Sequence, residues 1–304
     1  MDLFGAAQRS WNSAARALVR PFDLGAWLAF GFVSFLASLV DPGLGFSGRG
    51  PNLPGTSPPG GRPSAPLPDL DEPLRALSEH SDTILVAGAL VLVATLAAGA
   101  LAAWIGCRGL MIAYRSAHQG RVAIGEGWRE TRAPANALFR LHLALSLVGL
   151  LVMLPVLGLA AARLWGEWEA GERDAAALVA SLAPHMVLAG VVALAGATAA
   201  FVLRTFIAPY LLFFRCTSGE AWSRFASLLR ARPGAVLGLL VARAALSVAL
   251  GAISTLVSTV TCCVGGLPVL HQTILAPVCF FDRAFTLHAL ASIDDEHALL
   301  APER

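Results

Sequence analysis

The sequence has few charged residues and no lysine. Only 14% of its 304 residues are charged, and all 22 basic residues are arginine. A soluble domain carries roughly a quarter charged residues. The formal net charge of +2 is small, and the arginines are spread along the chain instead of forming one basic stripe. The composition therefore argues against an ordinary soluble domain and against a nucleic-acid-binding protein.

Cysteine is also scarce. The chain has five cysteines, an odd number that excludes a fully paired disulfide framework. Cys262 and Cys263 are the only adjacent pair, and no His or Cys pair at metal-ligand spacing accompanies them. We interpret them as small apolar packing residues, with redox or metal chemistry as the alternative. No cofactor and no metal are expected.

Common catalytic motifs are missing. The sequence has no Gly-x-Ser-x-Gly, no His-Glu-x-x-His, no Gly-rich phosphate loop followed by Lys and no dinucleotide fingerprint. No two carboxylates are expected to face each other across an apolar segment. Four acidic residues that lie close together in the sequence are interpreted as part of a solvated loop: Glu167, Glu169, Glu172 and Asp174. An enzymatic role has little support, and no catalytic residue is assigned.

Long apolar segments dominate the chain instead. Hydrophobic residues make up 56% of the sequence, and the mean hydropathy is +0.67. The sequence predicts an all-α transmembrane helix bundle, one domain over residues 1–304, with six spans arranged as three hairpins. The predicted spans are residues 24–40, 83–105, 137–160, 185–206, 236–260 and 267–290. Residues 41–82 hold half of the 18 prolines, so we predict a disordered outer loop there.

Three amphipathic segments are predicted to lie in the membrane interface. In residues 1–20, Trp11 shares an apolar face with Ala14 and Leu18. The second segment surrounds Trp128, and the third surrounds Trp222. Thr217 and Glu220 have capping-box spacing at the start of this third helix, and Pro233 ends it. We interpret one residue in each segment as an interfacial anchor: Trp11, Trp128 and Trp222.

The distribution of arginine predicts the orientation. Sixteen arginines belong to the two termini and the second and fourth connections with their flanks, against five in the first and third connections. Basic residues favour the cytoplasmic side of a membrane. We therefore predict a multi-pass protein of the bacterial inner membrane with both termini in the cytoplasm and the interfacial helices on that side.

Two charges are predicted to meet inside the membrane. Arg243 lies about 10 Å into the fifth span at 1.5 Å per residue, where an unpaired charge costs roughly 3 kcal/mol or more. Asp282 approaches the inner end of the sixth span at a similar depth. The sequence therefore predicts an Arg243–Asp282 contact that closes the last hairpin. The alternative is that Arg243 extends to the inner surface alone.

Other polar residues within the spans are candidates as well. Arg283 follows Asp282, and Arg204 lies near the inner end of the fourth span, where we interpret it as an anchor. His271 and Gln272 lie near the outer end of the sixth span. They either line a cavity or, as is common for such residues, hydrogen-bond a neighbouring helix.

Several short patches carry a family resemblance. They are PFDLGAWL at 21–28, EAW at 220–222, CC at 262–263, AP at 276–277 and FDRAF at 281–285. Together they resemble an uncharacterised group of bacterial six-span membrane proteins, which is loosely similar to the membrane domain attached to some glycerophosphoryl diester phosphodiesterases. The resemblance implies no phosphodiesterase activity, because that chemistry belongs to a separate soluble domain. The sequence departs from the group in its polar His271-Gln272-Thr273 and its Pro-rich first loop.

These features favour a non-enzymatic role as a membrane scaffold or as the partner of another membrane complex. A transporter or channel for a small or lipid-like solute is the second hypothesis, and a membrane enzyme is the third. The expected partners are the lipid bilayer and either another membrane protein or a second copy of the chain, with no nucleic acid. A water-filled cavity near Arg243, His271 and Asp282 favours transport. A closed bundle with an apolar or basic cytoplasmic face favours partner binding.

Overall fold

The described part of the protein is helical throughout. The computed structural model describes residues 2–20, 22–41, 81–170, 175–260 and 268–293, together with His297 and Ala301. No strand occurs in these residues, which confirms the predicted all-α class. Three predicted features lie outside the described residues: most of the Pro-rich loop, the Cys262–Cys263 turn and the acidic end of the tail.

In chain order, the described helices are α1 (Leu3–Ala14), α2 (Leu24–Ser38), α4 (Ser81–Gln119), α5 (Ile124–Glu130), α6 (Arg132–Glu169), α7 (Ala175–Val202), α8 (Ala208–Phe213), α9 (Ser218–Ala231), α10 (Pro233–Val260), α11 (Pro268–Ile274) and α12 (Ala276–Ala291). Two π-helical turns continue α1 and α7: η1 (Ala15–Val19) and η3 (Leu203–Ile207). α4 runs past residue 105, the predicted end of the second span, because no proline interrupts residues 106–119, and it ends before Gly120, which takes a left-handed φ of 67°.

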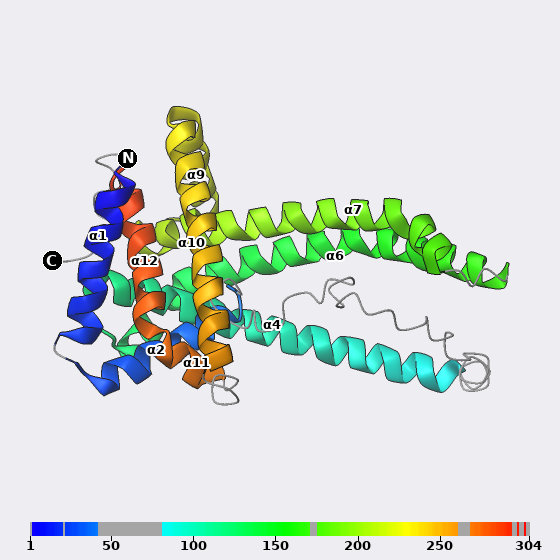
Figure 1. Cartoon of the computed structure of the whole chain (residues 1–304), viewed down its shortest axis with the longest axis horizontal. Coiled ribbons are helices and arrows are strands. Elements are labelled where there is room, and N and C mark those ends of the chain that lie inside the picture. Colours follow the sequence, from blue (N-terminus) through cyan, green and yellow to red (C-terminus); the bar gives the residue numbers. More distant parts are fainter. Residues whose placement is uncertain are drawn as a thin grey trace.

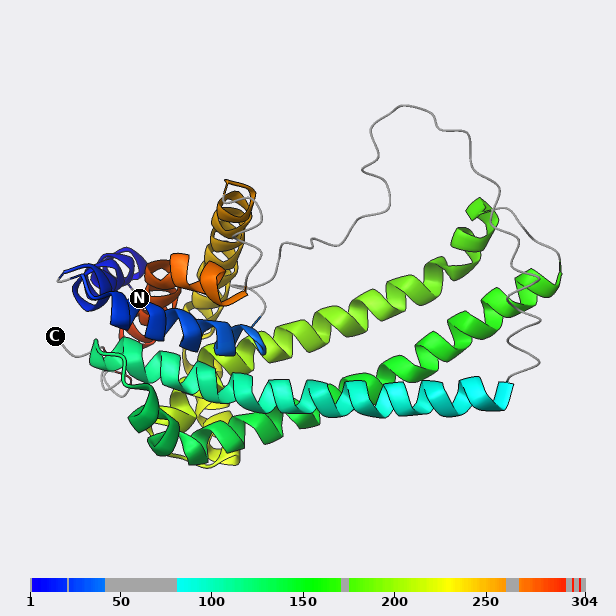
Figure 2. The same ribbon diagram turned by 90° about the horizontal axis from the view of Figure 1, so that it is seen from below.

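The molecule has an extended part and a compact part. Helices α4, α6 and α7 reach away from the rest of the chain side by side (Figures 1 and 2). The side chains on their projecting halves are mostly apolar and exposed. In the compact part, α1, α2, α10 and the second half of α4 surround α12, most of which is buried. The core therefore lies at one end of the three long helices.

Within the described residues, four helices are long and apolar enough to cross a membrane. They cover Val86–Gln119, Arg132–Glu169, Ala177–Phe213 and Pro233–Val260. The first predicted span forms α2, whose 15 residues rise about 22 Å, less than the roughly 30 Å of a bilayer core. The last predicted span is divided between α11 and α12. In both views α10 runs across α4, α6 and α7 (Figures 1 and 2), so these segments do not form three parallel hairpins.

Two prolines explain where helical segments break. Pro277 follows the break between α11 and α12 and lies in the first turn of α12, where its missing N–H costs nothing. Pro209 lies in the first turn of α8, directly after η3. Its ring conflicts with the carbonyl four residues earlier, at Thr205 inside η3, so the backbone widens to π geometry there. The two Ala-Pro patches therefore both begin a new helical segment.

Close packing of α2 on α4 depends on glycine. A Cβ atom at Gly109 would lie 2.5 Å from the Cβ of Leu36 and 2.6 Å from the backbone nitrogen of Ala37. Gly106 is similarly close to Val40. Small residues of this kind let two helix backbones approach each other in a membrane protein.

We expect Gly109→Ala to destabilise the protein by about 1–3 kcal/mol, because the backbone of α2 must move away. Gly99→Ala is the matched control, since nothing lies within 4 Å of the Cβ position at Gly99 in the same helix. The control should be neutral or stabilising by about 1 kcal/mol. Thermal unfolding of both variants in one detergent measures the difference, and equal melting temperatures would contradict the packing.

The three predicted amphipathic segments are all helical. The capping box of α9 is present, with Thr217 accepting from the Glu220 amide and Glu220 accepting from the Thr217 amide. In the first segment Ala14 and Leu18 are buried and the helix packs on α12, but Trp11 is exposed. The predicted apolar face of this segment is therefore divided, because Ala14 and Leu18 are covered and Trp11 is not.

Candidate functional site

Five charged residues from distant parts of the chain meet in the compact part. We call this group the buried ion network. It consists of Asp41 after α2, Arg204 in η3, Arg243 in α10 and the neighbours Asp282 and Arg283 in α12. Three arginines and two aspartates give the network a formal charge of +1. Four of the five residues are candidates from the sequence analysis, and Asp41 was not predicted.

Asp41 bridges two arginines. Its Oδ2 lies 2.8 Å from Nη2 of Arg283, and its Oδ1 lies 3.1 Å from Nη1 of Arg204. The same Arg204 nitrogen donates to the carbonyl of Val40 at 2.7 Å. Burial raises the pKa of Asp41, but Arg283 and Arg204 more than offset burial and lower that pKa to about 2. Asp41 is therefore charged at neutral pH.

These contacts correct two expectations from the sequence. Asp41 was the first residue of the predicted disordered loop, yet it is buried and paired. Arg204 was interpreted as an anchor, whereas its guanidinium group is held by Asp41. Asp41 is separated in the sequence from Arg204 by 163 residues and from Arg283 by 242 residues, so a local sequence pattern does not identify it as their partner.

Arg243 and Asp282 are in contact, as the sequence predicts. Nη1 of Arg243 donates to Oδ1 of Asp282, and the two side chains are only 3% and 1% exposed. Nη1 of Arg283 lies 3.6 Å from the other carboxylate oxygen of Asp282. The Arg243 side chain therefore does not extend to the surface alone.

Tyr114 in α4 connects the network to the long helices. Its hydroxyl group donates to the carbonyl of Arg204 at 2.9 Å. The guanidinium carbon of Arg283 lies 5.5 Å from the centre of its ring, within the range of a cation–π interaction. Tyr114 is one of only two tyrosines in the sequence. A polar-tipped aromatic residue within an apolar segment was the signal that could have identified it.

His271 and Gln272 bond to neighbouring helices. Nε2 of His271 lies 2.7 Å from the hydroxyl oxygen of Ser254 in α10. The thiol of Cys279 donates to Oε1 of Gln272 at 3.4 Å. Both residues are buried. These contacts match the helix-bonding alternative of the sequence analysis.

The three anchor tryptophans have different surroundings. Trp11 and Trp222 are exposed. The rings of Trp11 and Phe281 pack edge to face, with their centres 6.4 Å apart. Trp128 is partly buried, its ring centre lies 6.2 Å from that of Trp104, and the guanidinium carbon of Arg108 lies 5.0 and 4.8 Å from the two ring centres. Trp128 therefore packs α5 onto α4.

The network can hold helices together electrostatically. Its acidic groups are neutralised by arginine, and guanidinium groups stay protonated near neutral pH. Among the residues that the structure describes, no group of three or more His, Cys, Asp and Glu side chains could hold a metal ion. The geometry supports the role of a clamp that fixes α10, α12, η3 and the end of α2 to one another.

The sequence model of a family of unknown function (DUF7544) matches residues 6–299, nearly the whole chain. The chain belongs to this family. The match covers the ion network, the long helices and α9. The DUF7544 family is of unknown function, which agrees with the part of the resemblance that predicts an uncharacterised family. No curated protein and no solved structure matches the chain.

Proposed function

We propose that this DUF7544 protein is a multi-pass protein of the bacterial inner membrane that binds another membrane protein and catalyses no reaction. In this proposal both termini are cytoplasmic, and α1, α5 and α9 lie at the cytoplasmic interface. The proposal is supported by the arginine-rich connections, because those after α4 and after α7 lie at the same end of α6. A chain that obeys the charge rule for membrane proteins needs these connections on one side.

The closed ion network is the observation that favours a docking role over transport. Arg243 and Asp282, the residues best placed to form a path through the membrane, are nearly inaccessible and pair with each other. Exposed aromatic side chains lie elsewhere: Phe4 and Trp11 of α1 are 83% and 59% exposed. Aromatic residues are enriched at interfaces with proteins and at membrane interfaces. The resemblance to phosphodiesterase membrane domains fits this role, because chemistry belongs to another domain there.

One observation favours transport as a second function. Oδ2 of Asp282 and Nε of Arg243 have no hydrogen-bond partner although both atoms are buried. Buried polar groups without partners are costly and are found at functional sites. A transporter would use these atoms to hold a polar solute in an open state of the same helices.

Purification in a mild detergent, followed by reconstitution, separates the two functions. A docking protein should co-purify with a stoichiometric membrane partner, and replacing Phe4 and Trp11 by Ala should release that partner without lowering the melting temperature. The purified chain alone should show no solute flux in liposomes. A saturable solute flux through the native chain with no partner bound would contradict docking and support transport.

A further inference from the structure

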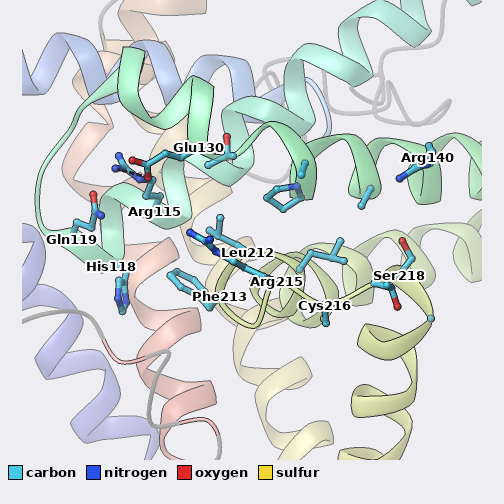
Figure 3. A pocket seen from close by; sticks show the side chains of 17 residues that line it. Arg115, His118, Gln119, Glu130, Arg140, Leu212, Phe213, Arg215, Cys216 and Ser218 are labelled. Carbon is cyan, nitrogen blue, oxygen red and sulfur yellow. Dashed lines mark ion pairs between the residues drawn. The ribbon is translucent and has the colours of Figure 1, made fainter.

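A basic cavity lies at the end of α4, and no residue of the ion network lines it. Its volume is about 980 Å³, within the range of ligand pockets. The cavity opens between the end of α4, the start of α6 and the connection from α8 to α9 (Figure 3). Both connections that supply its walls belong to the arginine-rich side of the protein.

Positive charge is in excess around the cavity. Arg115, Arg140 and Arg215 line it, against a single carboxylate, Glu130. Arg115 is held in place, with Nη2 2.9 Å from Glu130 and 3.0 Å from Glu126. In the described part of the chain, the side chains of Arg140 and Arg215 form neither an ion pair nor a hydrogen bond. A concave surface with two uncompensated guanidinium groups attracts anions.

Arg215 is held in an unusual backbone conformation. Its φ of 48° lies in the left-handed region, which non-glycine residues rarely adopt. Two adjacent contacts fix the turn: the thiol of Cys216 donates to the carbonyl of Tyr210 at 3.5 Å, and the Thr217 capping box begins α9 directly afterwards. Figure 3 shows the Arg215 side chain extending from this turn into the cavity toward Arg115. Strained residues of this kind cluster at binding sites.

The wall of the cavity is apolar as well as basic. Leu212 and Phe213 at the end of α8 contribute apolar surface, and Phe213 packs on His118 with ring centres 4.7 Å apart. Hydroxyl groups come from Thr217 and Ser218. Guanidinium groups match the geometry of phosphate oxygens, and hydroxyl groups add donors to them.

We propose that this cavity binds a phosphate group, with Arg215 as its principal cationic contact and with Arg140, at the other end of the cavity in Figure 3, adding positive charge. The phosphate belongs either to the headgroup of an anionic phospholipid or to a small soluble phosphate ester. If the ligand is a phospholipid, its headgroup contacts the arginines and its acyl chains lie along the apolar surface of α6 beyond Arg140. This proposal does not depend on the docking role.

Binding to the purified full-length protein tests the proposal in two arms. One arm measures phosphatidylglycerol against phosphatidylcholine in nanodiscs, with bound lipid counted by native mass spectrometry. The other measures glycerol 3-phosphate and inorganic phosphate by equilibrium dialysis in detergent. We expect saturable binding in at least one arm, weakened at least tenfold in the Arg140→Gln/Arg215→Gln variant. Binding only in the first arm assigns a lipid, and binding only in the second assigns a soluble phosphate.

The matched control removes the same charge elsewhere. Arg129 and Arg230 are exposed and do not line the cavity, so Arg129→Gln/Arg230→Gln should bind almost as tightly as the native protein. If Arg215→Gln folds poorly, Arg215→Gly keeps the left-handed turn while removing the guanidinium group. Equal losses in the cavity variant and the control would overturn the proposal, as would the absence of saturable binding in both arms.

Discussion

Replacing Asp282 by Asn is expected to lower the free energy of unfolding by about 3–5 kcal/mol, because it leaves buried arginine charge without its partner. Arg243 is only 3% exposed and contacts Asp282 through Nη1, so water cannot replace the lost carboxylate in the folded state. Equilibrium unfolding in mixed micelles measures the loss. Asp2→Asn is the control: its ion pair with Arg9 is exposed at 3.9 Å, and its loss should cost at most about 1 kcal/mol.

A double-mutant cycle separates pairing from general burial. Once Arg243 is replaced by Met, the further change Asp282→Asn should cost much less than it does in the native protein. Arg283 still contacts Asp282 in that background, so a residual loss remains. Independent, additive losses from the two substitutions would show that Arg243 and Asp282 do not stabilise each other.

The second large effect is expected on the exposed side of α4. Val93 is 63% exposed and lies near the middle of the predicted second span. An arginine at this depth in a bilayer costs roughly 3 kcal/mol, so Val93→Arg should sharply reduce the amount of membrane-inserted protein. In water the same exposed position would accept arginine with a change of about 0.5 kcal/mol or less.

The control for this substitution is Val19→Arg, at an exposed position of η1 outside the four long apolar helices. Quantitative immunoblotting of washed membranes compares the two variants with the native protein. Equal amounts of inserted protein for Val93→Arg and Val19→Arg would mean that α4 does not face lipid.

The sequence was most informative where a local physical requirement acts. Thr217 and Glu220 predicted the start of α9 because an uncapped helix leaves amide groups unsatisfied. The Arg243–Asp282 contact followed from the cost of an isolated charge in an apolar segment. Gly120 ends α4, although Arg108 and Arg115 make residues 106–119 look like a connection in the sequence.

Long-range geometry was beyond the sequence pattern. Asp41 carries no local sign that two arginines more than 160 residues away will bind it. The direction of α10 was also hidden, because apolar residues on all of its sides give no preferred face. The cavity at Arg215 depends on a left-handed backbone at a residue that is not glycine, which no motif announces. The periodicity of apolar residues therefore predicted helices, but it predicted neither the angles at which they cross nor the basic cavity at the end of α4.

We propose that α6 crosses the membrane with the arginine-rich connections on the cytoplasmic side. Reporter fusions after Gly120 and after Ala170 test it directly, because these residues flank the two ends of the α5–α6 segment. We predict that a fusion after Gly120 is active only as a cytoplasmic reporter and that a fusion after Ala170 is active only as an external one. Finding both reporters on the same side of the membrane would contradict the account.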